Sequence, residues 1–369
     1  KIDQYFTDHG FRRSKSEPTL YIKTQGQHTL LLSLYVDDLI FTGTNTNMMM
    51  EFKEDMMKTF EMTDLGLMSY FLGIEVSQRN DGIFISQKKY TEALLKKFNM
   101  YGCKPISTPL VTNEKLQKVD GAPEADASRY RMAYSDPTQY RSLVGALQYL
   151  TITRPDLSYA VNTVSQFLQA PTIDHFQAVK RILRYVCGTQ HFGLTFRSSP
   201  SPAVLGYSDA DWARCTDTRR STYGYAIFLG DNLLSWSAKK QPTVARSSCE
   251  SEYRAMANTA SELVWLLNLL RELRVGLSAT PLLLSDNQSA LFMAQNPIAH
   301  KHAKHIDLDC HFIRELVASG RLAVRHVPTS LQLADIFTKA LPRPLFELFR
   351  SKLRVGLNPT LSLTGGVKS

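Results

Sequence analysis

Four acidic residues in the C-terminal half lie where predicted strands and helices begin or end. Asp209 ends an apolar strand, Glu252 lies in the first turn of a long predicted helix, and Asp286 follows a short apolar strand. Asp335 falls near the start of the last predicted helix. Carboxylates brought together repel one another unless cations neutralise them, and Mg²⁺ takes carboxylate and water ligands. Two such ions, about 4 Å apart, could activate a water and stabilise the leaving oxygen of a phosphodiester.

Each of these acids also has a purely structural interpretation. Asp286 could cap a helix, and Asp335 could complement a helix dipole. Asp209 could be a turn residue and Glu252 a solvated helix residue. Their joint placement favours the metal site, because adjacent first and fourth strands would bring Asp209 and Asp286 together beside both helix starts.

The elements that would position these acids alternate between strands and helices. The apolar spacing and turn residues predict strands at 203–209, 223–230 and 233–237, a helix at 249–274, a strand at 282–285, helices at 288–295 and 306–319, a strand at 322–327 and a last helix at 331–340. This order predicts a three-layer α/β domain around a mixed sheet.

A second acidic pair lies near the start of the chain. Tyr35, Val36, Asp37 and Asp38 interrupt an apolar run and are predicted to form the turn of an otherwise buried hairpin. Because desolvating two adjacent acids is costly without a cation, we predict that Asp37 and Asp38 bind metal.

Two groups of basic residues are candidates for contact with nucleic acid. Lys180, Arg181 and Arg184 fall in a helical segment and could follow a phosphate backbone, although a solvated helix face explains each one nearly as well. Further along the chain, Lys301, Lys304 and His305 are predicted to form a polar entry to a helix that faces phosphates. A metal site formed by His300, His302, His305, His311 and Cys310 is the less favoured alternative, since their spacing matches no strong zinc signature.

Composition limits the class of protein. The chain has 369 residues, with 43 basic against 34 acidic residues and a formal charge of +9. This excess fits a partner with a phosphate backbone, or serves solubility. The five cysteines include no CxxC pair, so neither a disulfide framework nor a thiolate zinc site is indicated. With no signal peptide and no apolar run long enough to cross a bilayer, we expect an intracellular protein without a membrane partner.

Several segments resemble those of one family. The strings YSDADWA, RSTYGY, SCESEYRAMA, SDNQSA and LADIFTKALP resemble the ribonuclease H domain of copia-type retrotransposons, over about residues 203–345. The tetrad YVDD resembles the YxDD turn of reverse transcriptases, and TDLGLMSYFLGIEV and YRSLVGALQYLTITRPDLSYAV resemble later parts of the copia-type enzyme. Nearly the whole chain therefore resembles the C-terminal part of a copia-type (Pseudoviridae-like) Pol polyprotein.

This resemblance implies a fold class that combines α/β and α+β parts. The expected parts are a partial reverse-transcriptase palm with the start of the thumb at 1–107, a linker at 108–138 and a small helical thumb or connection at 139–200. A ribonuclease H-like three-layer domain with a mixed sheet is expected at 201–345, and a C-terminal tail at 346–369.

The implied activity is Mg²⁺-dependent endonucleolytic hydrolysis of the RNA strand of RNA–DNA hybrids. By motif position, Asp209, Glu252, Asp286 and Asp335 would bind two Mg²⁺ ions, with Mn²⁺ as a substitute. Glu252 is preferred over Glu250 because it precedes the YRAMA run. Asp209 is preferred over Asp211 because it directly follows the apolar strand.

The implied polymerase is expected to be inactive in this chain alone. Asp37 and Asp38 would be metal ligands in a full enzyme, but no upstream aspartate in an apolar strand precedes them. The expected partners are an RNA–DNA hybrid and a preceding polymerase segment or other polyprotein products, in the cytoplasm (virus-like particle) or the nucleus. The alternative is a degenerate or repurposed remnant that binds nucleic acid without catalysis.

Two departures from the family pattern carry expectations of their own. The loop at 328–334 contains no histidine, His326 falling in the strand before it, so slower turnover is expected. Arg214 stands where relatives usually have glycine, so a strained turn is expected there.

Overall fold

The structure, a computed structural model, describes residues 2–112, 114, 116–118, 136–199, 202–296 and 307–359. The chain forms two compact units. The first unit contains Lys1–Ser69 and Ser261–Leu277, and the second contains Tyr70–Ala260 and Ser278–Ser369. Among the described residues, no helix combines the length and the apolar character that spanning a membrane requires.

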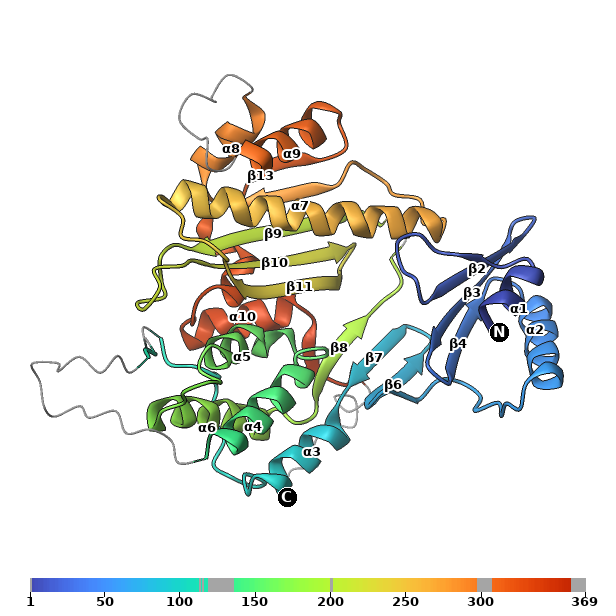
Figure 1. Cartoon of the computed structure of the whole chain (residues 1–369), viewed down its shortest axis with the longest axis horizontal. Helices are drawn as coiled ribbons and strands as arrows, with labels where there is room; N and C mark the ends of the chain where they lie inside the picture. Colours follow the sequence, from blue (N-terminus) through green and yellow to red (C-terminus); the bar gives the residue numbers. More distant parts are fainter. Residues whose placement is uncertain are drawn as a thin grey trace, which may run out of the picture. The chain divides into compact units, whose positions relative to one another are not determined.

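The first unit is built on a four-stranded antiparallel sheet in the order β1-β2-β3-β4 (Figure 1). Its strands and helices are α1 (Ile2–Asp8), β1 (Arg12–Arg13), β2 (Leu20–Gln25), β3 (His28–Tyr35), β4 (Asp38–Gly43) and α2 (Thr46–Thr59). Asn45 caps α2 by accepting a hydrogen bond from the backbone N–H of Met48. Leu30, Leu32 and Phe52 belong to the apolar core between sheet and helices.

The second part of a long helix, α7 (Ser248–Glu272), completes the first unit. The indole N–H of Trp265 donates to the carbonyl of Ser16 at 2.9 Å, and the Ser16 hydroxyl donates to Glu272 at 2.9 Å. These bonds join the loop before β2 to a helix more than 200 residues later in the chain. The first turns of α7 belong to the second unit.

The main sheet of the second unit has five strands in the order β11-β10-β9-β12-β13. The strands are β9 (Val204–Asp211), β10 (Thr222–Leu229), β11 (Asn232–Lys240), β12 (Leu282–Ser285) and β13 (Ala323–His326). The first three pair antiparallel, whereas β12 runs parallel to both β9 and β13. The predicted mixed sheet, with the first and fourth strands as neighbours, is therefore confirmed.

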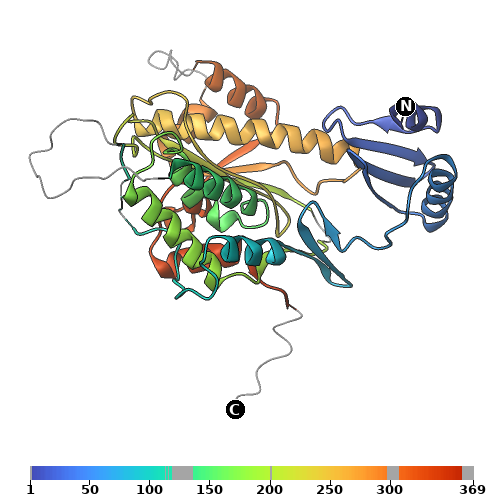
Figure 2. The same ribbon diagram turned by 60° about the horizontal axis from the view of Figure 1, so that its bottom comes forward.

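Elements cover both faces of this sheet. Because strand side chains alternate between faces, Ala226 and Phe228 of β10 pack in one core, while Ile227 points to the opposite face. In two views, α7 runs along one side, and α4 (Pro137–Leu150), α5 (Ser158–Ser165) and α6 (Ile173–Gly188) lie on the other (Figures 1 and 2). Helices α8 (Gln288–Gln295) and α9 (Asp307–Ala318) flank β12 and β13.

The prediction of a last helix at 331–340 is wrong. The chain forms two 3₁₀ turns there, η4 (Thr329–Leu331) and η5 (Leu333–Phe337). Side chains at both ends of η5 bond to β9: the Gln332 amide donates to the carbonyl of Ser208 at 2.9 Å, and the Thr338 hydroxyl donates to Asp209. These bonds to a distant strand, which local periodicity does not reveal, hold the backbone in short turns.

A third sheet joins segments from distant parts of the second unit. Its order is β14-β8-β7-β6-β5, with every described neighbour pair antiparallel. The strands are β5 (Tyr70–Phe71), β6 (Ile74–Arg79), β7 (Gly82–Ser86), β8 (Phe192–Phe196) and β14 (Val355–Leu357). Helix α3 (Lys88–Lys97) follows β7 in the chain, and α10 (Arg343–Lys352) precedes β14. A short 3₁₀ turn, η1 (Pro155–Leu157), precedes α5. The segment expected as a C-terminal tail thus contributes buried Phe346, Phe349 and Val355 to the core.

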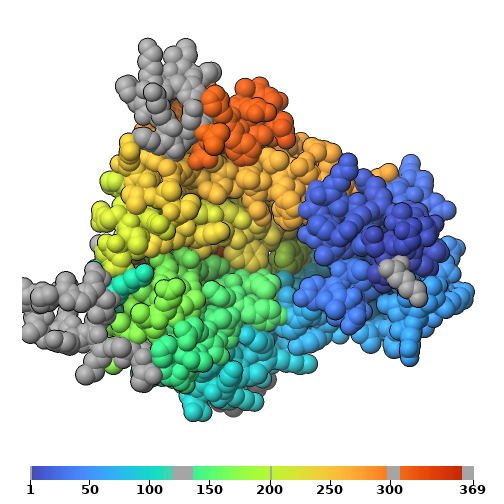
Figure 3. Space-filling view, in the orientation of Figure 1, coloured from blue at the N-terminus to red at the C-terminus, as the bar shows by residue number. Residues whose placement is uncertain are grey.

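One core connects the helices to the main sheet. It contains residues of α4, α5 and α6 together with Phe228, Leu333 and Phe337. In the space-filling view the surfaces of these helices and of β10 and β11 meet directly (Figure 3). The predicted boundaries at 107, 138, 200 and 345 stay predictions.

A buried ion pair links the turn between α4 and α5 to the end of α6. Arg154 and Asp156, 3% and 2% exposed, pair at 2.8 Å. Arg154 also donates to the carbonyl of Thr189, and the Tyr185 hydroxyl donates to Asp156 at 2.6 Å. Removing one partner of such a pair leaves a buried charge uncompensated and typically costs about 3–5 kcal/mol.

The close approach of η5 to the main sheet depends on a glycine. Gly224 on β10 lies opposite Asp209 on β9. A Cβ added at Gly224 would collide with the Cβ of Phe337. The missing side chain therefore lets η5 lie against the sheet beside Asp209.

We predict that Gly224→Ala lowers the free energy of unfolding by about 1–3 kcal/mol, because the added methyl group overpacks this contact. The matched control is Gly145→Ala, in the interior of α4, where an added Cβ meets nothing within 4 Å. Alanine there should stabilise the helix by about 0.5–1 kcal/mol. Urea denaturation of both variants measures the difference, and equal stabilities would contradict the role given to Gly224.

Candidate active site

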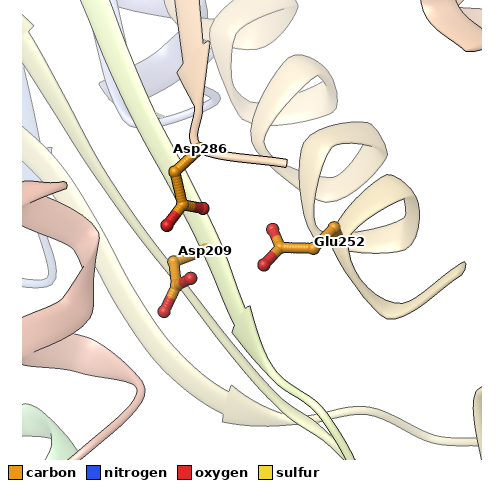
Figure 4. A group of neighbouring side chains, drawn as sticks. All are labelled: Asp209, Glu252 and Asp286. Carbon is orange, nitrogen blue, oxygen red and sulfur yellow. The ribbon is translucent and has the colours of Figure 1, made fainter. Parts of the chain in front are cut away.

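Three carboxylates converge in the second unit. Asp209 comes from β9, Glu252 from the first turns of α7, and Asp286 follows the end of β12 (Figure 4). One carboxylate oxygen from each lies within 4.8 Å of the others. Asp209 and Glu252 are 3% and 6% exposed, so this acidic cluster is largely removed from water.

The fold brings these three acids together through two local features. Because β9 and β12 are parallel neighbours, their carboxyl ends lie at the same edge of the sheet, which places Asp209 near Asp286. The start of α7 is fixed by Gln241, just past β11, whose amide donates to the carbonyl of Ser251 at 2.9 Å. That bond holds the first turn of the helix, and so Glu252, at the sheet edge.

The fourth predicted acid, Asp335, lies beside the cluster and faces a lysine. It is 3% exposed, and one of its oxygens lies 2.9 Å from Nζ of Lys339. The residue before the lysine, Thr338, donates a hydrogen bond from its hydroxyl to Asp209. The structure therefore places all four predicted acids in one region, with Asp335 outside the group of three closest carboxylates.

Burial and mutual repulsion make these carboxylates hard to ionise together. Burial, and then the charge of Asp286, raise the pKa of Asp209, although Lys339 and Thr338 oppose the rise. Burial, and then Asp209 and Asp286, raise the pKa of Glu252 well above its usual value. Burial and Asp209 raise the pKa of Asp335 to about 8. A cation at the cluster would reverse these shifts.

The oxygen atoms at the cluster fit a divalent cation. Oε2 of Glu252 is buried and has no hydrogen-bond partner among the described residues. Such an orphaned acceptor needs a donor or a cation. Among the described residues Asp286 accepts one hydrogen bond, from the Thr329 hydroxyl at 2.9 Å, which leaves further lone pairs available. An all-carboxylate set of this kind suits Mg²⁺ or Mn²⁺.

The geometry separates the two acids that compete with the preferred candidates. Glu250 pairs with Arg254 at 2.7 Å and accepts the backbone N–H of Arg246 at 2.8 Å. Asp211 pairs with Arg214 at 2.9 Å. Neither belongs to the acidic cluster.

The strain expected at Arg214 lies elsewhere. The residue with a left-handed backbone is its neighbour Ala213, at φ 52°, whereas Arg214 has no positive φ. The Arg214 side chain is instead held by Asp211.

The hairpin that carries Asp37 and Asp38 differs from the sequence expectation. Tyr35, Val36, Asp37 and Asp38 are all exposed, and Val36 adopts a φ of 53°. The expected burial of the acidic pair is therefore wrong for this structure, because the hairpin turn projects beyond the apolar part of its sheet. Within the described residues, neither acid takes part in a group that could hold a metal ion.

The basic candidates have different environments. Arg181 donates to the Thr108 hydroxyl at 3.0 Å and Arg184 to the carbonyl of Lys104 at 2.8 Å, so both hold the segment after α3 against α6. Lys180 is exposed, with its ammonium over the ring of Phe176. Contact of these residues with nucleic acid stays a prediction. His300, Lys301, His302, Lys304 and His305 lie outside the described residues.

Three residues at the site were missed from the sequence: Thr329, Thr338 and Lys339. Only Lys339 had a usable signal, since it follows Asp335 by four residues, the spacing of an ion pair on one turn of helix. The two threonines bond to Asp286 and Asp209, which are 43 and 129 residues away along the chain.

Comparison with known proteins agrees with this architecture. A sequence model described as reverse transcriptase (RNA-dependent DNA polymerase) matches residues 1–112. The Retrovirus-related Pol polyprotein from transposon RE2 of Arabidopsis thaliana is 43% identical over 355 residues, covering 96% of this chain and 24% of that protein. The uncharacterized mitochondrial protein AtMg00810 of Arabidopsis thaliana is 48% identical over 236 residues, 64% of this chain and 94% of that protein.

Solved structures with similar arrangements come from two kinds of protein. One is the foamy viral protease-reverse transcriptase, solved in complex with an RNA/DNA hybrid. The match covers 81% of the present chain and 36% of the foamy viral chain, at 12% identity and a TM-score of 0.44. The N-terminal RNase H domain of rv2228c from Mycobacterium tuberculosis, as a maltose-binding-protein fusion, covers 41% of this chain and 98% of that chain. Its identity is 18% and its TM-score 0.29.

The match at 1–112 identifies a reverse-transcriptase region, and a mixed sheet with acids at adjacent strand ends follows it in the chain. More particularly, the chain belongs to the copia-type retrotransposon Pol polyprotein family. The predicted family and fold class are thereby confirmed. The chain spans only 24% of the length of the RE2 relative.

The raised pKa of Asp335 predicts a pH dependence of stability in the presence of a chelator. The folded chain holds this proton more tightly than the unfolded chain, so the stabilisation is complete below about pH 4 and is lost as the pH rises to about 8. Asp335→Asn should remove much of this loss, a few kcal/mol at most. Thermal unfolding between pH 4 and 9 measures it.

The control for this experiment is Asp231→Asn, because the Asp231 side chain is 82% exposed. That variant should keep the pH dependence of the unchanged chain. If Asp335→Asn kept it as well, burial of an ionised Asp335 would not be the cause.

Proposed function

We propose that the second unit hydrolyses the RNA strand of RNA–DNA hybrids as a ribonuclease H that depends on Mg²⁺, with Mn²⁺ as a substitute. The observation that carries this proposal is the buried acidic cluster of Asp209, Glu252 and Asp286, with Asp335 beside it. The family membership supports it, because relatives of this chain are named as Pol polyproteins.

The chain's own residues divide the work at the site. Asp209 and Asp286 present oxygens from adjacent strand ends, and Glu252 presents a buried, unpartnered oxygen from α7. These acids would hold the two cations, which when bound supply a water of lowered pKa and stabilise charge on the leaving oxygen. Thr338 and Thr329 orient Asp209 and Asp286 by donating hydrogen bonds, so the carboxylates need little reorganisation.

We also propose that the first unit is part of a polymerase palm that does not extend primers by itself. Asp37 and Asp38 lie in an exposed turn, and the described residues place no third carboxylate close enough to complete a metal site with them. Primer extension by this chain alone should therefore be absent.

We predict that the purified chain cleaves a labelled RNA–DNA hybrid in Mg²⁺ and that Asp209→Asn lowers the rate about 100-fold or more, equivalent to ~2.7 kcal/mol in the barrier. The variant removes one negative charge from Asp209, which lies next to each of the other three acids. The matched control is Asp211→Asn, two residues along the same strand, where the acid pairs with Arg214 instead. It should retain most of the activity.

The outcomes separate the candidate functions. Loss of cleavage in Asp209→Asn but not in Asp211→Asn supports the ribonuclease H. A folded chain that binds the hybrid in a salt-sensitive way without Mg²⁺, yet cleaves nothing, would be a remnant that binds nucleic acid without catalysis. Equal loss in both variants would show that the aspartates act through folding.

A further inference from the structure

We infer that the Lys339 ammonium group partly replaces a divalent ion at this site. It pairs with Asp335 and neutralises negative charge near Asp335 and Asp209. It thereby weakens the binding of a second divalent ion at that position. The first ion would accordingly bind on the side of Asp209, Glu252 and Asp286. This inference rests on the proposed function and concerns the order and strength of cation binding at the same site.

The position of Lys339 is set by the residue that it neutralises. Its backbone N–H donates to the carbonyl of Asp335 at 3.1 Å, and its Nζ lies 2.9 Å from Oδ1 of Asp335. Both contacts span one turn, from Asp335 within η5 to Lys339, two residues after its end. The neighbouring Thr338 is bonded to Asp209, so the turn that carries Lys339 is anchored to β9. The ammonium is therefore held next to two carboxylates rather than free in solvent.

The cluster is consequently asymmetric in charge. On one side, the Lys339 ammonium lies 2.9 Å from Oδ1 of Asp335, in the turn that Thr338 bonds to Asp209. On the other side, no ion pair within the described part of the chain reaches Glu252 or Asp286. Oε2 of Glu252 and Oδ1 of Asp335 both lack a hydrogen bond among these residues, but only Oδ1 of Asp335 has an ammonium group 2.9 Å away. A cation is thus most needed where Glu252 lies and least needed where Lys339 lies.

The surroundings of Lys339 suit a side chain that can be displaced. A lysine ammonium is a compact charge on a flexible stem, without the fixed two-pronged geometry of arginine. The Lys339 side chain is 32% exposed, whereas that of Asp335 is 4% exposed. A small hollow lined by Thr108, Tyr159 and Leu341 adjoins the lysine.

A simple structural role makes a different prediction. An ion pair with the buried Asp335 stabilises the fold by neutralising that carboxylate, and its loss leaves a buried charge uncompensated. If Lys339 served only this purpose, its removal would lower the stability and leave cation binding unchanged. Cation binding therefore distinguishes a positioning residue of the site from a local ion pair.

The test is calorimetric titration of Mn²⁺ into the full chain and into Lys339→Met, a change that keeps the length of the stem and removes the charge. In the unchanged chain the second ion should bind more weakly than the first. In Lys339→Met the second ion should bind about tenfold more tightly or better, equivalent to ~1.4 kcal/mol. The Mn²⁺ dependence of hybrid cleavage should shift to lower concentration in the same variant.

Three further variants complete the design. Lys339→Arg keeps the charge and should bind Mn²⁺ as the unchanged chain does. Lys352→Met removes an exposed lysine from α10 and should also change nothing. Lys339→Gln gives a second neutral variant if the methionine variant does not fold, as judged by circular dichroism.

Failure of this inference and failure of the proposed function give different results. Absence of Mn²⁺ binding in every folded variant would overturn the metal-dependent hydrolase itself. Binding of Mn²⁺ to the unchanged chain with the same affinities in the neutral Lys339 variants would overturn only the role of Lys339. Tighter second-site binding in both Lys339→Met and Lys352→Met would overturn it too, since net charge alone would explain the effect.

Discussion

The central constraint on the second unit is the presence of several carboxylates close together in a largely buried region. Asp209, Glu252 and Asp335 are each almost fully buried, and burial raises the pKa of all three, with Asp209 adding to the rise at Glu252 and Asp335. Such an arrangement costs stability unless hydrogen bonds and cations compensate it. Two threonine hydroxyls and one lysine provide part of this compensation. The rest of the fold must therefore stabilise these carboxylates.

That support comes from elements far apart in the sequence. The parallel pairing of β9 with β12 brings two strand ends together, and the bond from Gln241 fixes the start of α7. Gly224 leaves the room in which η5 approaches the sheet. The same core continues into α4, α5 and α6, and the buried Arg154–Asp156 pair links the turn before α5 to the end of α6. The position of the carboxylates is thus coupled to helices outside the region predicted as ribonuclease H.

The membership in the copia-type family gives both units a context. The matched reverse-transcriptase region ends at residue 112, and the second unit begins at Tyr70, so the compact unit and the family region overlap. The third sheet explains this overlap, because β5, β6 and β7 pair with β8 and β14 from later parts of the chain. A boundary drawn by family resemblance therefore differs from one drawn by packing.

The sequence by itself determined the five strands of the main sheet, the long helix and the four acids, because these depend on local periodicity and on acids at the ends of apolar segments. Strand β12 and helix α8 have the predicted bounds. In the tertiary structure the preferred Glu252 and Asp209 join the acidic cluster, whereas Glu250 and Asp211 pair with arginines. Only the tertiary structure replaced the last helix by 3₁₀ turns and placed Lys339 beside Asp335. It also showed Arg181 and Arg184 bound to the segment after α3 and the Asp37–Asp38 turn exposed. Which acids meet in the cluster depends on the pairing of β9 with β12 and on the start of α7, and a local pattern carries no information about contacts between segments far apart in the chain.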